Sequence, residues 1–169
     1  LGVNKVIGAA GAAVGVTVDG AALKTLTINA SGKASNVTLG QTIDTIATLD
    51  IIGKADLTLD FATTTTSKIA TIDGSKAQGK LDLNLAGTTP ATLKTVKTGS
   101  ADDKLALSIA VASGTTIDLG AGNDKLVAGT AGSVVASTTT VIDGGAGIDS
   151  LDAALVNVGN AGVFASFET

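Results

Sequence analysis

The sequence predicts an all-β fold, a right-handed parallel β-helix or β-roll solenoid of about seven coils of 20–25 residues each. Short segments that alternate apolar with small or polar residues recur along the chain, as in half-buried strands. A second apolar position precedes each segment, and the steps between successive positions of this kind are 20, 23, 23, 24, 21 and 25 residues. Helical periodicity is weak, and Gly, Thr and Val are common. A repeat of this length made of strands and glycine turns indicates coils stacked on the same sheets.

The predicted strands share an alternating pattern that starts at Val or Leu. They are 14–18, 37–39, 57–61, 81–85, 105–109, 126–128 and 151–153. The apolar residues that precede them are Val6, Leu26, Leu49, Ile72, Val96, Ile117 and Ile142. In the last four repeats, nine residues separate this apolar residue from the start of the strand. We therefore expect equivalent residues to stack in columns, with small aliphatic side chains filling a narrow interior.

The composition excludes several classes of function. The chain has 169 residues and a net charge of −4, and it contains no His, Cys, Trp, Tyr or Arg. Without His or Cys it cannot form a Ser-His-Asp or Cys-His triad or a zinc finger. The negative charge and the lack of Arg argue against binding to nucleic acid. With 44% hydrophobic residues the chain can build a core, and we expect residues 1–169 to form a single solenoid without enzymatic activity.

No transmembrane segment is predicted. The apolar run 6–18 is too short to cross a bilayer and is interrupted by glycines. The chain starts at Leu1 and stops in an apolar segment, so we expect it to be part of a longer polypeptide. On that interpretation Phe164 and Phe167 pack against a following segment.

Three related glycine loops lie between the apolar residue and the strand in the C-terminal part of the chain. Residues 144–152 fit the nonapeptide G-G-x-G-x-D-x-U-x in full. Residues 119–127 depart from it at Leu119, and residues 98–106 depart at Thr98 and Ala101. The earlier coils, residues 1–97, have no aspartate loop of this type, so we expect two regions: 1–97 without calcium loops and 98–169 with them.

These loops predict a calcium site between stacked coils. Glycines allow the turn that directs carbonyl oxygens into the gap, each loop adds a carboxylate, and Ca²⁺ takes about six to eight such oxygens. One site would lie between loops 119–124 and 144–149, and a second between loops 98–103 and 119–124, so Asp124 would be shared. Stacked carboxylates would repel each other without a cation, although plain glycine turns remain the alternative. The predicted ligands are Gly99, Asp103, Gly120, Gly122, Asp124, Gly145, Gly147 and Asp149.

A second charged column follows the apolar positions by one residue. Its members are Asp50, Asp73, Lys97, Asp118 and Asp143. Two interpretations stay open: a solvated face whose ion pairs contribute little, or a surface that bridges to neighbouring molecules through cations.

The nonapeptide loops resemble those of RTX proteins, and the whole chain resembles RTX-type bacterial surface-layer (S-layer) proteins. The resemblance lies in the Ala/Thr/Gly-rich texture without Cys, in residues 68–73, in irregular coils before the loops and in the closing segment 162–169. It implies a protein of the Gram-negative cell surface, secreted by a type I route, with calcium ordering both the fold and a two-dimensional lattice. It also implies self-association, with attachment to lipopolysaccharide or another surface glycan through other parts of the chain.

Two other functions are compatible with parts of the sequence. One is a module of a secreted RTX adhesin that binds a surface ligand. The sequence argues against an ice-binding module of this type, because Thr17, Thr38 and Thr58 form no repeated Thr-x-Thr row. The other is an enzyme on a β-helix, such as a polysaccharide lyase, whose cleft usually needs basic and aromatic side chains that this chain lacks.

Overall fold

The computed structural model of the chain describes residues 2–3, 12–18, 22–40, 45–61, 68–85, 92–107, 111–129 and 139–168. These residues form two parallel β-sheets. The first sheet contains, in spatial order, β1 (Gly2–Val3), β3 (Thr25–Ala30), β5 (Thr48–Gly53), β7 (Thr71–Ala77), β9 (Thr95–Lys97), β11 (Thr116–Asp118), β13 (Val141–Asp143) and β15 (Phe164–Ala165). The second contains β2 (Val14–Val16), β4 (Ser35–Leu39), β6 (Leu57–Phe61), β8 (Leu81–Leu85), β10 (Lys104–Leu107), β12 (Lys125–Ala128) and β14 (Ser150–Leu151).

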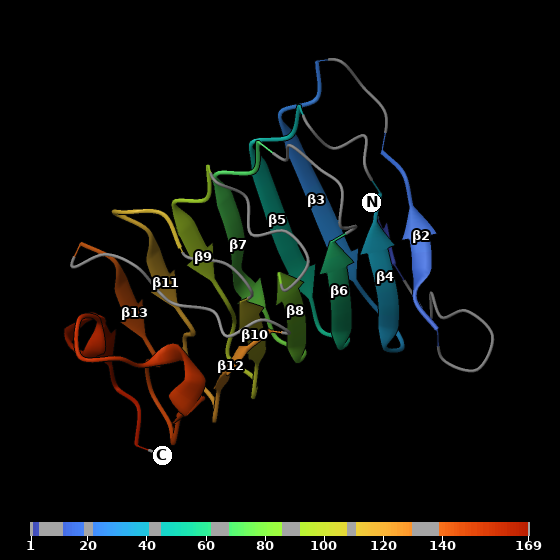
Figure 1. Cartoon of the computed structure of the whole chain (residues 1–169). Helices are drawn as coiled ribbons and strands as arrows, with labels where there is room; N and C mark the ends of the chain where they lie inside the picture. Colours follow the sequence, from blue (N-terminus) through green and yellow to red (C-terminus); the bar gives the residue numbers. More distant parts are fainter. Residues whose placement is uncertain are drawn as a thin grey trace.

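The chain alternates between the two sheets, so each odd-numbered strand and the even-numbered strand after it make one coil. The stack runs from the N-terminal coil to the C-terminal one, and the two sheets lie along the same axis (Figure 1). The predicted all-β parallel solenoid is therefore confirmed. Five central coils, from β3–β4 to β11–β12, have at least three residues in each strand, whereas the coils at the two ends each include a strand of two residues.

The apolar residues that precede the predicted strands are themselves the centres of the first sheet. Neighbouring strands pair these residues directly, one per coil, in a single column. The column runs Leu26, Leu49, Ile72, Val96, Ile117 and Ile142. The predicted stacking of equivalent positions is thus confirmed for the described coils, whereas Val6 lies outside the described residues.

The core lies between the two sheets. In β4, β6 and β8 every second residue is buried, which is the pattern expected when one face of a strand packs inward. Leu59, Leu83, Leu105 and Leu126 form a column of leucines with no exposed surface. Each buried leucine contributes about 1.5–3 kcal/mol relative to exposure, so the regular columns account for much of the stability of the stack.

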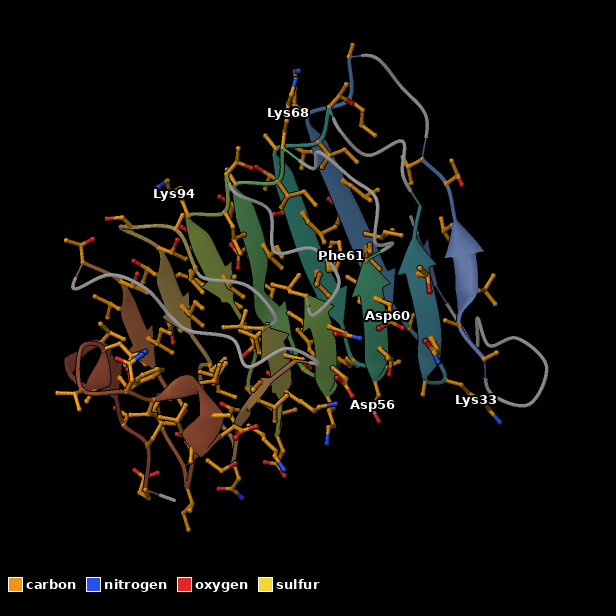
Figure 2. All side chains as sticks on the ribbon, in the orientation of Figure 1. Lys33, Asp56, Asp60, Phe61, Lys68 and Lys94 are labelled. Atoms are coloured by element: carbon orange, nitrogen blue, oxygen red, sulfur yellow. The ribbon has the colours of Figure 1, made fainter. Side chains whose placement is uncertain are left out.

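Polar side chains cover the outer face. The Asn84 side-chain amide donates to Oδ1 of Asp60 on the neighbouring strand at 2.8 Å, which links β8 to β6. In Figure 2, Lys33, Lys68 and Lys94 project away from the stack. Phe61, at the end of β6, is by contrast only 6% exposed. Inward and outward positions therefore alternate as the sequence pattern predicts.

Some predicted strands end earlier than expected. The strand predicted over 14–18 ends at Val16, and the one predicted over 105–109 ends at Leu107, after which residues 108–110 lie outside the described part. The strand predicted over 151–153 ends at Leu151. There the Asp152 carboxylate accepts a hydrogen bond of 3.0 Å from the amide of Ala154 and caps a short 3₁₀ helix, η2 (Ala153–Leu155). This local cap competes with the extended conformation and turns the chain.

The C-terminal segment packs onto the last coil. After η2 come a second 3₁₀ helix, η3 (Ala161–Val163), and β15, which pairs with β13. The rings of Phe164 and Phe167 meet edge to face, with centroids 6.3 Å apart, and pack against the core. The expected contact of these rings with a following segment stays a prediction. Nowhere among the described residues is there a helix long and apolar enough to span a bilayer.

Candidate cation site in the stacked glycine loops

The glycines of the predicted loops hold backbone conformations that other residues rarely adopt. The φ angles are +87° at Gly120, +126° at Gly122, +92° at Gly145 and +146° at Gly147. The loops are also stacked too closely for a side chain, because a Cβ at Gly147 would lie 1.8 Å from the Gly122 carbonyl oxygen. Glycine is thus required at these positions for both conformation and space.

Carbonyl oxygens of these loops do point toward the neighbouring coil, and there they accept hydrogen bonds. The amide of Ala121 donates to the Gly99 carbonyl at 3.1 Å, and the amide of Ala146 donates to the Gly120 carbonyl at 2.9 Å. In the opposite direction, the amide of Gly122 donates to the Ala146 carbonyl at 2.9 Å. Each of these carbonyl oxygens has a second lone pair, but its first partner is the next loop.

The three loop aspartates form a hydrogen-bonded ladder along the stack. The amide of Asp103 donates to Oδ1 of Asp124, and the amide of Asp124 donates to Oδ1 of Asp149, both at 2.7 Å. At the C-terminal end, the amide of Asp149 donates to Oε2 of Glu168 at 2.7 Å. At the other end, Oδ1 of Asp103 accepts from the amide of Leu81 at 2.7 Å. The aspartates are 0–2% exposed, so the ladder runs through the interior.

This ladder continues a column that is apolar in the preceding coils. Leu57 and Leu81 are paired in register, and the carboxylate of Asp103 binds the backbone of Leu81 in the next coil. The aspartates thus take an inward position that leucines occupy earlier in the chain. Burial raises the pKa of Asp103, and it raises the pKa of Asp124 to about 7, with the charges of neighbouring aspartates adding to the effect.

Two oxygens of the ladder have no hydrogen-bond partner. They are Oδ2 of Asp124 and Oδ2 of Asp149, both fully buried. Oδ2 of Asp103, in contrast, accepts from the amide of Gly99 at 2.8 Å. Buried polar atoms are nearly always satisfied, so the two unpartnered carboxylate oxygens are the positions at which the ladder can bind a further ligand.

The surroundings of Asp149 suit a hard cation. A Cβ at Gly144 would lie 2.8 Å from Oδ2 of Asp149 and 2.1 Å from the Ser166 carbonyl oxygen, so both oxygens pack closely against the side of Gly144 that has no side chain. Carboxylate and carbonyl oxygens are the ligands that Ca²⁺ prefers. Within the described ranges no three acidic side chains converge as a metal cluster, so backbone oxygens and water would have to complete the shell of an ion held here.

Aspartates of the second charged column form the turns at which the glycine loops begin. Oδ1 of Asp118 accepts from the amide of Gly120 at 3.1 Å, and Oδ1 of Asp143 accepts from the amide of Gly145 at 3.0 Å. Lys97 takes the equivalent place in the preceding coil, and its Nζ lies 3.8 Å from Oδ2 of Asp118. A partly exposed pair of this kind contributes little, so the main structural role of these aspartates is in the turn.

The earlier members of this column lie over β5 and β7. Asp50 and Asp73 are paired in register and border a depression on the outer face that Thr27 and Lys76 also line. Hydrogen bonds from the hydroxyl and amide of Ser75 lower the pKa of Asp73. Asp50 and Asp73 have the same charge, and the sign changes only at Lys97, which pairs with Asp73 on one side and Asp118 on the other. Bridging to other molecules stays a prediction.

Three contributors to the site were not anticipated from the sequence. Glu168 ends the ladder. The feature of the sequence that could have pointed to it is that it is the only glutamate in the chain. Asp102 and Asn123 form a second ladder outside the first: Oδ1 of Asp102 accepts from the amide of Asn123 at 2.8 Å, and Oδ1 of Asn123 accepts from the amide of Ile148 at 2.9 Å. Their signal is a polar side chain directly before two of the three loop aspartates, Asp103 and Asp124.

Comparisons with known proteins identify no relative. No family model, no curated protein and no solved structure matches the chain. The chemistry assigned to the loops accordingly rests on the geometry of the ladder and on its two unpartnered oxygens.

Proposed function

We propose that this chain is a calcium-stabilised β-solenoid segment of a bacterial S-layer, which assembles into a lattice on the cell surface. The observation that carries the proposal is the pair of buried, unpartnered oxygens on Asp124 and Asp149. The solenoid fold, the glycine loops and the resemblance to RTX-type S-layer proteins support it.

A cation resolves the electrostatic problem of the ladder. An ionised carboxylate buried without a partner is costly, and here three carboxylates are stacked in one interior column. A proton can neutralise one of them near neutral pH, because the pKa of Asp124 is about 7. A divalent cation neutralises two and adds ligand bonds. Calcium suits this site better than magnesium, because it accepts many protein oxygens in irregular geometry.

The proposed role is structural rather than catalytic. The chain has no His, Cys, Arg or Tyr, which removes several of the side chains that acid–base and nucleophilic catalysis use. The strands β14 and β15, which are the last in the two sheets, present edges on which further strands can pair. Calcium in the loops would stiffen the coils next to these edges and so couple cation binding to assembly.

Thermal unfolding with added calcium or chelator tests the cation part of the proposal. Calcium binds the stacked loops and not the unfolded chain, so at 100 times its Kd it should add about 2.7 kcal/mol per site. Magnesium should add much less. The variant Asp149→Asn should lose about half of the calcium response, whereas Asp82→Asn, which removes a carboxylate on the outer face of β8, should keep it. A midpoint that is the same in calcium and in chelator would refute the calcium assignment.

Electron microscopy tests the lattice. Protein purified in chelator should form ordered two-dimensional sheets when calcium is added and lose them when it is removed. Calcium-dependent stabilisation without any sheets, together with binding to a surface ligand, would favour the adhesin module instead.

A further inference from the structure

The three glycine loops share one frame, which allows a direct comparison between them. In each loop a charged residue is followed two positions later by a glycine and six positions later by the buried aspartate. Strand pairing places these charged residues in one column and the residues after the aspartates in another. The three sets are Lys97–Gly99–Asp103, Asp118–Gly120–Asp124 and Asp143–Gly145–Asp149.

In two of these loops the side chain of the first aspartate accepts a hydrogen bond from the glycine amide. Asp118 accepts from Gly120, and Asp143 accepts from Gly145. The buried aspartates of the same two loops are the ones with an unpartnered Oδ2. The turn at the start of the loop thus keeps the glycine amide away from the buried carboxylate.

In the third loop a lysine takes the place of the first aspartate. A lysine side chain has only donors, so Lys97 cannot accept from the amide of Gly99. That amide donates instead to Oδ2 of Asp103 at 2.8 Å, while Oδ1 of Asp103 accepts from Leu81. Both oxygens of this buried carboxylate are therefore occupied by backbone amides.

We propose that the residue two positions before the loop glycine decides whether the buried carboxylate can bind a cation. Asp118 and Asp143 are positioning residues that free an oxygen of Asp124 and of Asp149, whereas Lys97 leaves the Gly99 amide to bond Oδ2 of Asp103. The inference rests on the proposed calcium function and refines it: the cations lie at Asp124 and Asp149, and none is centred on Asp103.

The coil before these loops shows that the turn and the carboxylate are separate requirements. Asp73 makes the same turn, accepting from the amide of Ser75 at 3.0 Å. The sixth position after Asp73 is Gly79, so no carboxylate is there to be freed. A cation position in this fold therefore needs two residues. One is a hydrogen-bond acceptor two positions before the loop glycine, and the other is an aspartate six positions after that acceptor.

Two substitutions at Lys97 separate this mechanism from a simple charge effect. Lys97→Asn and Lys97→Gln remove the same positive charge, but an Asn side chain readily accepts from the amide two residues on, whereas the longer Gln does not favour this turn. Isothermal titration of the chelator-treated protein with calcium chloride gives the number of ions per chain. We expect two ions for the wild type, one more for Lys97→Asn, and no change for Lys97→Gln.

Two substitutions at Asp118 test the opposite change. Asp118→Asn keeps the turn but loses the charge, and it should keep both ions. Asp118→Glu keeps the charge but loses the short turn, so the amide of Gly120 becomes free to bind Oδ2 of Asp124, and one ion should be lost. Circular dichroism on each variant verifies that the solenoid is folded.

The outcomes distinguish this inference from the proposed function. If the wild type binds no calcium, both fail. If it binds three ions, or if the ion count follows charge rather than turn geometry at both positions, the positioning role fails while the calcium function stands. An extra ion in Lys97→Asn alone, with one ion lost in Asp118→Glu alone, is the result the geometry requires.

Discussion

The amide of Asp149 donates a 2.7 Å hydrogen bond to Oε2 of Glu168, so a glutamate completes a ladder otherwise built from aspartates. Glu168 also returns a bond, because its own amide donates to the Asp149 carbonyl at 3.0 Å. The longer side chain reaches the ladder from a segment that follows η3 and β15 rather than from a glycine loop. The last coil is thereby tied to the interior column and not only to the sheet.

Loss of the Glu168 carboxylate should loosen the C-terminal coil. In Glu168→Ala the buried amide of Asp149 has no acceptor, which costs about 1–3 kcal/mol. Glu168→Gln keeps an acceptor and should cost less. Hydrogen exchange at the Asp149 amide, measured by NMR, should accelerate strongly in the Ala variant. Equal exchange in the wild type and in Glu168→Ala would show that the bond does not hold this coil in solution.

The stability of the cation-free protein should fall as the pH rises toward and through 7. The folded chain holds a proton on Asp124 up to a pH of about 7, whereas the unfolded chain releases it near 3.8. The stabilisation is complete below 3.8 and is lost as the pH passes the folded pKa, with a slope of up to about 1.4 kcal/mol per pH unit for one group. Urea unfolding in chelator from pH 4 to 8 measures this slope.

Two comparisons identify the group responsible for that pH dependence. Asp124→Asn cannot titrate at this position, so its stability should vary less over the same range. Saturating calcium should reverse the trend in the wild type, because protons compete with the cation for the carboxylate. A wild-type profile that is flat in chelator would contradict the raised pKa.

Asp124 should contribute more to calcium binding than Asp103 does. Asp124 has a free buried oxygen, whereas both oxygens of Asp103 accept from backbone amides. Asp124→Ala should therefore lose at least one bound ion and Asp103→Ala should lose none, although both variants should be less stable. Calcium counted per chain by atomic spectroscopy after gel filtration decides this. Equal losses in the two variants would restore the site that the sequence predicts between loops 98–103 and 119–124.

Close stacking of the loops predicts a large difference between two glycines with similar backbone angles. Gly114 has φ +75° and open space around it, so Gly114→Ala should cost about 1–2 kcal/mol for the left-handed conformation. Gly145 has φ +92°, and a Cβ there would lie 2.0 Å from the Gly120 carbonyl oxygen. Gly145→Ala must also move a neighbouring loop and should cost at least about twice as much. Denaturant unfolding of the two variants compares them, and equal costs would mean that the loops are less tightly stacked.

Regular spacing is what allowed the sequence to predict the stack. The steps between Leu26, Leu49, Ile72, Val96, Ile117 and Ile142 vary by a few residues, yet all six fall in one column. Apolar residues on a common face have to be buried together, so periodicity determines the coil even where turns differ in length. The sequence analysis did not assign these residues to strands. The strands β9, β11 and β13 have three residues each and are too short to show alternation, whereas β3, with six residues, does alternate between exposed and buried positions.

Irregularities within coils were decided by the tertiary structure. In β7 the pairing with β5 shifts after Asp73, so that Ile52 lies opposite Lys76. A bulge of this kind adds a residue to one strand without changing the apolar pattern on either side of it. The spacing of residues in the sequence cannot show it.

The sequence by itself determined the parallel solenoid, the apolar columns and the three glycine loops, because these depend on repeat spacing and on residue types that recur every 20–25 residues. The tertiary structure alone decided what each loop carboxylate binds. Asp103, Asp124 and Asp149 have the same place in the motif, yet one has both oxygens bonded and the other two each have one free. The physical reason is that a carboxylate takes whichever donors are within about 3 Å, and only the folded loops show that the amides of Gly120 and Gly145 are bonded elsewhere while the amide of Gly99 is not.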